Sequence, residues 1–217
     1  RGTLSELVGE KGLVVDRLSR RIGFLKSAQR QLGVLDSDLR NRLHAFARGI
    51  TDGGTLGCSR PAHEFTLLRG RPTPYTAADT LGIAKLESFA LASNWDAELA
   101  RLRILREDGP EALEALDPSY PEWQPVSVPP GAPAGPSVDR LAEDMVALGA
   151  AISHGGGSNN WAIAPARTAS GRPILANDVH LAPTLPPHWY LVHVRTPEWA
   201  AAGGTFVGTP AFGVGHN

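Results

Sequence analysis

The chain has 217 residues, of which 42% are hydrophobic, and this is enough for one large domain or two small ones, each with a core. Its formal net charge of −1 gives no electrostatic attraction to nucleic acid or to an anionic membrane surface, so neither is expected as a partner. No stretch approaches the roughly 20 apolar residues of a membrane span. The single cysteine, Cys58, excludes an internal disulfide.

Residues 1–116 are expected to be mostly helical. Apolar residues recur every three to five positions and form an approximate helical stripe at Leu13, Leu18, Ile22 and Leu25. Asp36 is a candidate N-cap for a helix that ends near Gly53 and Gly54.

A loop with one short turn is expected over Arg60–Thr76, because this stretch is rich in proline and glycine. The spacing of Thr76 and Asp79 resembles a capping box, with Asp in place of Glu or Gln. We expect one long helix from there to about Glu107, before Gly109 and Pro110.

The character of the chain changes after residue 116. Proline recurs throughout residues 117–137, and because it removes N–H donors and disfavours helix at the preceding residue, an extended connector is expected. A short amphipathic segment, Val138–Ile152, follows. Apolar and alternating patterns then predict a hairpin of two strands and two further strands, at Trp161–Ala164, Pro173–Ala176, Tyr190–Arg195 and Thr205–Val207. Helices first and strands second predict an α+β fold.

Three glycines run into Ser158 between the connector and the first strand. A flexible linker is the commoner meaning of such a string. Alternatively, Ser158 is a nucleophile that becomes a new N-terminus when the chain cuts itself after Gly157. A serine hydroxyl needs a base, and a freed α-amine, with a reference pKa of about 7.7–8.0, can accept its proton. Glycine at 157 suits such a cut because it has no Cβ to block the approach of the hydroxyl.

Motifs along nearly the whole chain decide between these interpretations, because they resemble the penicillin acylase family of N-terminal nucleophile hydrolases. In the first part they are Arg1-Gly2-x-Leu4-x-Glu6-Leu7, Glu64-Phe65-x-Leu67-Leu68, Arg71-Pro72-x-Pro74-Tyr75-Thr76-x-x-Asp79, Lys85-Leu86 and Asn94-Trp95-Asp96-x-Glu98-Leu99. In the second part they are Gly157-Ser158-Asn159-Asn160-Trp161, Asn177-Asp178-Val179-His180-Leu181 and Gly208-Thr209-Pro210-Ala211-Phe212-Gly213-Val214-Gly215-His216-Asn217.

The resemblance implies an autoproteolytic serine amide hydrolase that removes an acyl group from an amine through an acyl-enzyme, and it needs no catalytic cofactor. It implies an αββα sandwich, of which this chain would hold part. Residues 1–116 would be the helical α-chain portion, 117–157 an excised spacer, and 158–217 the start of the nucleophile-bearing β chain. The partners implied are a small-molecule acyl amide and the remainder of the precursor, as an α/β heterodimer. Its location would be periplasmic or extracellular.

Site residues follow by position in the resembling motifs. Ser158 would be the nucleophile and Gly157 the residue before the cut. His180 would assist proton transfer between the serine hydroxyl and the α-amine, as in the aculeacin, acyl-homoserine lactone and cephalosporin acylase types, whereas the penicillin G type has glutamine. Leu181 and Val214 would line an apolar acyl pocket. Glu98 would be a ligand of a structural calcium.

The oxyanion stabilisers of the resembling family lie beyond Asn217, so residues 1–217 alone are expected to be inactive. Two alternatives stay open at this point. The chain could be an uncut or degenerate homologue that serves as a non-catalytic binding or scaffold module. It could also be an amide hydrolase with a different nucleophile, for which Cys58 is the candidate, although nothing in the sequence around it indicates activation. The substrate stays open among penicillins, acyl-homoserine lactones, cephalosporin side chains and lipopeptides.

Overall fold

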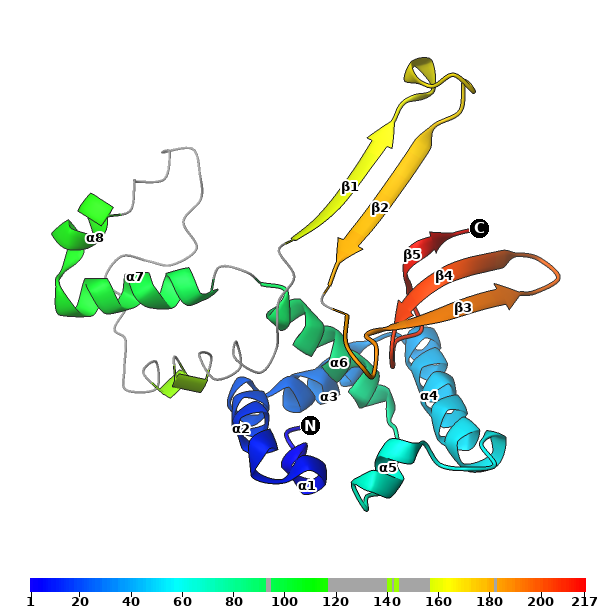
Figure 1. Cartoon of the computed structure of the whole chain (residues 1–217), viewed down its shortest axis with the longest axis horizontal. Helices are drawn as coiled ribbons and strands as arrows, with labels where there is room; N and C mark the ends of the chain where they lie inside the picture. Colours follow the sequence, from blue (N-terminus) through cyan, green and yellow to red (C-terminus); the bar gives the residue numbers. More distant parts are fainter. Residues whose placement is uncertain (93–94, 117–139, 142, 145–156, 182) are drawn as a thin grey trace. The chain divides into compact units, whose positions relative to one another are not determined.

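The computed structural model describes residues 1–92, 95–116, 140–141, 143–144, 157–181 and 183–217. Helices occupy the first part of the described chain and two antiparallel sheets the last, so the expected α+β class is confirmed (Figure 1). The predicted spacer lies largely outside the described residues. The chain divides into two compact units, Arg1–Gly23 with Ser88–Ala151 and Phe24–Glu87 with Ile152–Asn217. None of the described helices is both long and apolar enough to cross a membrane.

The first unit begins with two short helices before a longer one, and Asp16 on the longer helix holds the start of the first. The buried Asp16 carboxylate accepts hydrogen bonds from the backbone N–H groups of Leu4 at 2.6 Å and Ser5 at 2.8 Å, and from Ser5 Oγ. Leu18 is the most deeply buried large side chain of this unit's described part. The helices of this unit are α1 Ser5–Val8, η1 Gly9–Gly12, α2 Leu13–Ile22, α7 Trp95–Glu107 and α8 Pro110–Leu116.

Gly23 divides the stripe predicted over residues 13–25 between two helices. It has a φ of 78° and a ψ of 38°, the left-handed conformation that ends a helix and that glycine adopts without strain. Leu13, Leu18 and Ile22 therefore lie in α2, and Leu25 lies in the next helix.

Beyond the proline-rich connector, residues 140 and 144 are held against α2. The Arg21 guanidinium lies 2.5 Å from Asp144 Oδ2 and donates a hydrogen bond to the Arg140 carbonyl oxygen at 2.5 Å. The approach to Asp144 is an ion pair without hydrogen-bond alignment, since none of the described residues has a donor aligned with the buried Oδ2. A part of the predicted amphipathic segment is thus anchored to the helical portion.

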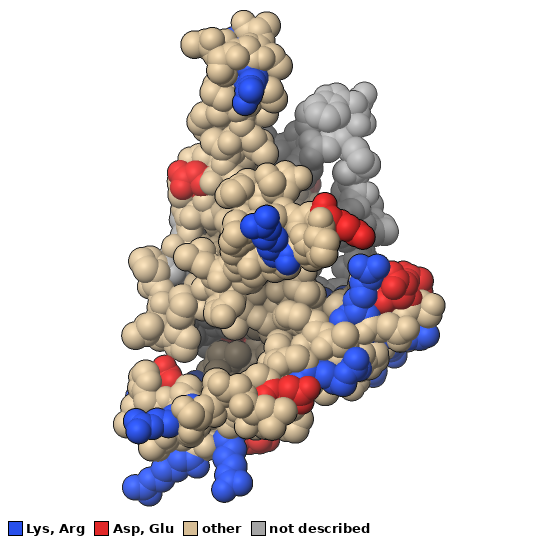
Figure 2. All heavy atoms as spheres, turned by 90° about the vertical axis from the view of Figure 1, so that its right-hand side faces the viewer, with Lys and Arg blue, Asp and Glu red and all other residues tan. Residues whose placement is uncertain are grey.

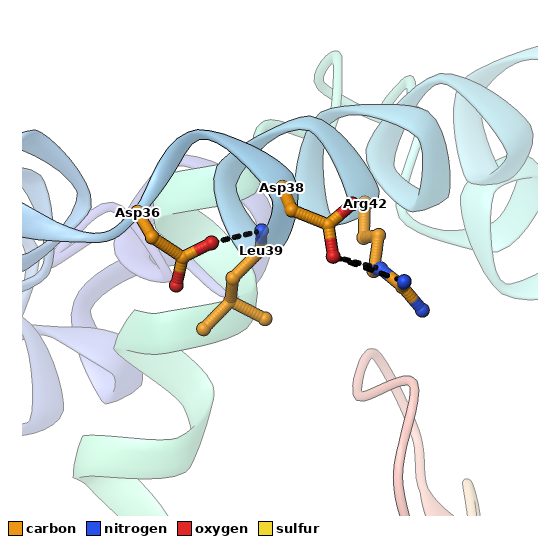
Figure 3. Close-up of polar contacts among 4 residues, drawn as sticks. All are labelled: Asp36, Asp38, Leu39 and Arg42. Atoms are coloured by element: carbon orange, nitrogen blue, oxygen red, sulfur yellow. Dashed lines mark hydrogen bonds and ion pairs between the residues drawn. The ribbon is translucent and has the colours of Figure 1, made fainter.

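The second unit opens with the helices that the capping signals predicted. Asp36 accepts a hydrogen bond from the Leu39 N–H at 2.9 Å and starts α4, and in its first turn Asp38 pairs with Arg42 (Figure 3). The α-helical part of α4 ends at Asp52, near the predicted end, and the chain continues directly as a π-helix over Gly53–Gly57. The helices of this unit are α3 Phe24–Val34, α4 Ser37–Asp52, η2 Gly53–Gly57 and α5 His63–Leu67, and most of α6 Ala77–Ala90 belongs to it.

The single helix predicted from Thr76 to Glu107 is wrong. Its start is correct, because Asp79 Oδ2 accepts hydrogen bonds from the N–H and Oγ1 of Thr76 at 2.8 and 2.6 Å. However, α6 ends at Ala90 and α7 begins at Trp95. The first turn of α7 carries Asp96 and Glu98, and acidic residues there stabilise a helix N-terminus, so these charges mark a second start.

The described residues contain five strands, which form two separate antiparallel sheets. β1 Gly157–Ile163 pairs with β2 Ile174–His180, as the predicted hairpin requires, and η3 Pro165–Arg167 lies in the connection between them. The second sheet has the order β3-β4-β5, from Trp189–Arg195, Ala200–Phe206 and Phe212–His216. Figure 2 shows one face, on which charged side chains are sparse over the strand hairpins and frequent over the helices.

The three-stranded sheet has glycines where aromatic and backbone groups approach closely. The Trp189 ring stacks on Phe206 with centroids 4.3 Å apart. A Cβ at Gly204 or Gly213 would lie 3.1 or 3.0 Å from atoms of the six-membered ring of Trp189, so this ring lies close against both glycines. The strand expected at Thr205–Val207 begins earlier, at Ala200, in a run rich in alanine and glycine that has no strand pattern. β5 was not predicted, because its glycines likewise give no strand pattern.

Candidate functional site

The β1–β2 hairpin brings together the two residues predicted to be catalytic. Ser158 pairs with Val179, which places it next to His180 on the facing strand. The His180 backbone N–H donates a hydrogen bond to Ser158 Oγ over 3.3 Å, between residues 22 positions apart. A donor aimed at a hydroxyl oxygen stabilises the negative charge that develops there as its proton leaves. The hairpin therefore places one polar N–H at the atom that would act as the nucleophile.

The His180 imidazole makes a different contact. Its Nε2 lies 2.7 Å from Asp178 Oδ2, two residues earlier on the same strand. Side chains two apart in a strand share one face, and the pairing of Ser158 with Val179 assigns Ser158 to the other face. In the uncut chain the ring of His180 thus belongs to the face opposite Ser158 Oγ.

Gly157, the predicted residue before the cut, is the first residue of β1. Its φ of 126° is one that residues with a Cβ rarely adopt, and a Cβ there would meet nothing within 4 Å. The position therefore favours glycine because of its backbone conformation, and the space beside its Cα is open.

Of the two predicted pocket residues, one follows the hairpin and the other lies in β5. Leu181 is half-buried directly after β2, and Val214 is half-buried opposite Gly204 in the three-stranded sheet. Asn177 Nδ2, from β2, lies 3.5 Å from the carbonyl oxygen of Gly213, the neighbour of Val214. This long hydrogen bond joins the strand that carries His180 to the strand that carries Val214.

Glu98 lies in the other compact unit, on the first turn of α7. Its carboxylate is exposed and pairs with the Arg101 guanidinium at 2.7 Å. Calcium takes six to eight oxygen ligands, and the described residues contain no group of three His, Cys, Asp or Glu that could hold a metal ion. Other carboxylate ligands of the predicted calcium would therefore have to come from outside the described residues.

Cys58, the alternative nucleophile, is exposed and follows the C-terminal end of η2. An activated cysteine needs an electropositive setting. The structure gives this alternative no support.

Sequence reasoning assigned no separate role to Asp178 or Asn177. Both lie in a motif that was noted for His180, and alternation along the strand would have placed Asp178 on the same face as His180. The orientation of the His180 ring could not be predicted from the sequence, because it depends on the contact that the ring makes with Asp178.

Comparison with known proteins finds matches over nearly the whole chain or all of it. A family model described as penicillin amidase matches residues 1–217, the whole chain. The acyl-homoserine lactone acylase QuiP of Pseudomonas aeruginosa is 32% identical over 228 residues, covering 100% of this chain and 26% of that protein. The penicillin acylase 2 proenzyme of Pseudomonas sp. (strain SE83) is 30% identical over 226 residues, covering 97% of this chain and 28% of that protein.

The matches cover nearly all of this chain but only part of each relative. QuiP of Pseudomonas fluorescens (strain Pf-5) is 29% identical and again covers 100% of this chain but 27% of the relative. The chain thus spans about a quarter of the length of the curated relatives it matches. No solved structure gives a significant match.

Proposed function

This chain belongs to the penicillin amidase family, and from that premise we propose that its parent protein is an amide hydrolase that uses Ser158 as an N-terminal nucleophile. The observation that carries the proposal is the contact across the β1–β2 hairpin, where the His180 N–H meets Ser158 Oγ directly after Gly157. The membership supports acylase chemistry, and the contact supports Ser158 as the residue that performs it.

The proposed self-processing is an acyl shift from nitrogen to oxygen. Ser158 Oγ attacks the carbonyl carbon of Gly157, the peptide C–N bond breaks, and the nitrogen takes up the hydroxyl proton. Water then hydrolyses the resulting ester, which leaves a carboxylate on Gly157 and a free α-amine on Ser158. The His180 N–H stabilises the charge on Oγ during the attack. The word proenzyme in the name of one relative describes that protein and supports a processed precursor here.

In the proposed turnover, the proton of Ser158 Oγ passes by way of His180 to the freed α-amine as Oγ attacks the substrate's amide carbonyl. The amine of the substrate leaves with that proton, and water releases the acyl group from Oγ. The imidazole belongs to the opposite face of the uncut hairpin, so this relay forms once cleavage frees Ser158 to turn. No cofactor is needed for these steps.

The substrate we propose is a small acyl amide with an apolar acyl group. Leu181 and Val214 are aliphatic and half-buried, and they would contact the acyl chain. The similarity to acyl-homoserine lactone acylases places acyl-homoserine lactones first in a panel that also contains penicillins, cephalosporin side chains and lipopeptides. Discrimination among chain lengths in an aliphatic pocket amounts to about 10–200-fold per methylene.

The proposal also covers the assembly. The fold would be an αββα sandwich built by an α chain and a β chain that stay together after removal of the spacer, and the protein would be periplasmic or extracellular. A structural calcium that uses Glu98 would need its other ligands from outside the described residues.

The test is expression of the full-length protein, followed by its intact mass and N-terminal sequencing. The wild type is expected to give a chain that begins at Ser158 and to hydrolyse at least one amide of the panel. Ser158→Ala removes the hydroxyl and is expected to stay whole and inactive. Ser170→Ala, in the exposed turn of the same hairpin, is the matched control and is expected to behave as the wild type. A folded wild type that stays whole and binds acyl amides without cleaving them would instead identify a degenerate, non-catalytic homologue.

A further inference from the structure

Asp178 stands out among the strand residues. It is the one carboxylate within the five strands that the structure describes, and aspartate is disfavoured in strands because its short polar side chain competes for backbone hydrogen bonds. The Asp178 side chain is 69% exposed and that of His180 is 44% exposed. An exposed ion pair contributes about 0–1 kcal/mol to the free energy of unfolding. Stability alone therefore does not explain an aspartate at this position of β2.

The chemistry of the contact is more informative than its energy. His180 Nε2 and Asp178 Oδ2 are 2.7 Å apart, the length of a charge-assisted hydrogen bond. An ionised carboxylate can only accept, so Nε2 must be the donor and carry the proton. In the neutral ring the lone pair is then on Nδ1, because the two nitrogens of a neutral imidazole hold one proton between them.

We propose that Asp178 is a positioning residue for His180, which holds the imidazole in the Nε2–H tautomer and leaves Nδ1 as the atom that takes the proton of Ser158. This inference rests on the proposed function. Asp178 does not touch the reacting atoms and acts through the ring. Its contact joins neighbours on one face of one strand, so the movement of Ser158 after cleavage leaves it intact.

The test uses the processed full-length enzyme labelled with ¹⁵N in its imidazole rings. The resonances of His180 are identified by their loss in His180→Asn. In the wild type they are expected to report the Nε2–H tautomer, whereas Asp178→Ala should give a mixture of both tautomers. The same variant should lower kcat by about 10–100-fold, by analogy with the range found when the partner that orients a metal-ligating histidine is removed, while KM stays within about twofold.

Two further variants complete the design. Asp178→Asn keeps the shape of the side chain but can present either its carbonyl oxygen or its NH₂ group to Nε2, so its effect is expected to lie between those of aspartate and alanine. Asp38→Asn removes an equally exposed aspartate that pairs with Arg42 at 2.9 Å, and it should change neither the His180 resonances nor kcat.

Three outcomes would overturn the inference. They are an Nδ1–H tautomer in the wild type, a tautomer that Asp178→Ala leaves unchanged, and a shifted tautomer with kcat unchanged. Failure of the proposed function is recognised separately. If Ser158→Ala still hydrolysed amides, Ser158 would not be the nucleophile, whichever tautomer His180 adopts.

Discussion

Ser158 and His180 meet through the backbone, since the N–H of His180 donates to Ser158 Oγ at 3.3 Å while the imidazole contacts Asp178 instead. One residue therefore offers two groups, on different sides of the hairpin. The N–H is present in any residue except proline, whereas the imidazole is specific to histidine. This separation allows self-processing and turnover to be tested one at a time.

His180→Ala is expected to process normally and to turn over poorly. The variant keeps the N–H that contacts Oγ but removes the proton-accepting ring, and loss of a general base costs about 10²–10⁴-fold in rate. Intact mass of the full-length variant and its kcat on the best amide of the panel give the two measurements.

His180→Asn and His180→Pro are the comparison variants. Asparagine keeps the N–H and should resemble alanine, whereas proline removes the N–H and should slow cleavage after Gly157. A His180→Ala protein that is folded and uncut would show that the ring takes part in processing, and one with full turnover would remove the assigned role of His180.

A buried carboxylate makes the first unit sensitive to acid. Burial raises the pKa of Asp16, but hydrogen bonds from Ser5 and Leu4, with the nearby charge of Arg20, outweigh it and lower that pKa below the ordinary aspartate value. Between the two values the unfolded chain binds a proton that the folded chain does not. The contribution of Asp16 is thus complete above about pH 4, the ordinary aspartate value, and is lost as the pH falls through the lowered pKa.

Asp16→Asn should therefore destabilise the protein at neutral pH and matter less in acid. An amide offers one acceptor oxygen where the carboxylate offers two, so a donor of Ser5 or Leu4 loses its partner, at a cost of about 1–3 kcal/mol. Thermal unfolding of the full-length protein at pH 7 and about pH 3 measures both effects. An equal loss at both pH values, or none at pH 7, would contradict the described role. Asp38→Asn, in an exposed pair, is the matched control.

A tyrosine ties the start of α6 to the turn before β5. Tyr75 Oη donates to the Gly208 carbonyl oxygen at 2.7 Å and lies 3.3 Å from Thr80 Oγ1. Tyr75→Phe should cost about 0.5–1.5 kcal/mol, the net value of one hydrogen bond. Thermal unfolding measures it, and Tyr190→Phe, on an exposed strand position, should change nothing. A loss equal to that of Tyr190→Phe would show that the hydroxyl contributes no stability.

Gly208→Ala tests the same turn by steric exclusion. Gly208 has a φ of 84°, and an added Cβ would lie 2.6 Å from Ile83 Cδ1 and 2.9 Å from Tyr75 Oη. Gly171→Ala is the matched control, because Gly171 has a φ of 65° and open space around its Cβ position. Both substitutions carry the backbone cost of about 1–2 kcal/mol, and Gly208→Ala should exceed it by the cost of moving Ile83. Equal thermal shifts for the two variants would contradict the close approach.

Much of the fold could be predicted where local signals are strong. The Asp36 cap and the apolar runs of the β1–β2 hairpin gave correct elements, because a cap and an alternating pattern act through neighbouring residues. The break between α6 and α7 was missed, since helix formers on both sides mask the second start at Trp95. β5 was missed because its short sequence contains Gly213 and Gly215, and glycine is depleted in strands.

The candidate site was predicted by residue but not by geometry. Ser158 and His180 were selected by their spacing in a resembling motif, and strand pairing does bring them together. The roles of backbone and ring could not be predicted, because a motif contains no information on which face a side chain takes or on its rotamer. Asp178 was overlooked for the same reason, although its position two residues before His180 was visible throughout.

The central claim is that Ser158 is freed by the chain itself and then performs the hydrolysis. Intact mass of the full-length protein, compared between wild type and Ser158→Ala, tests it most directly. The account predicts a wild-type chain that begins at Ser158 and an uncut, folded and inactive Ser158→Ala protein. A Ser158→Ala protein that is still cut before residue 158 and still hydrolyses an acyl amide would contradict it.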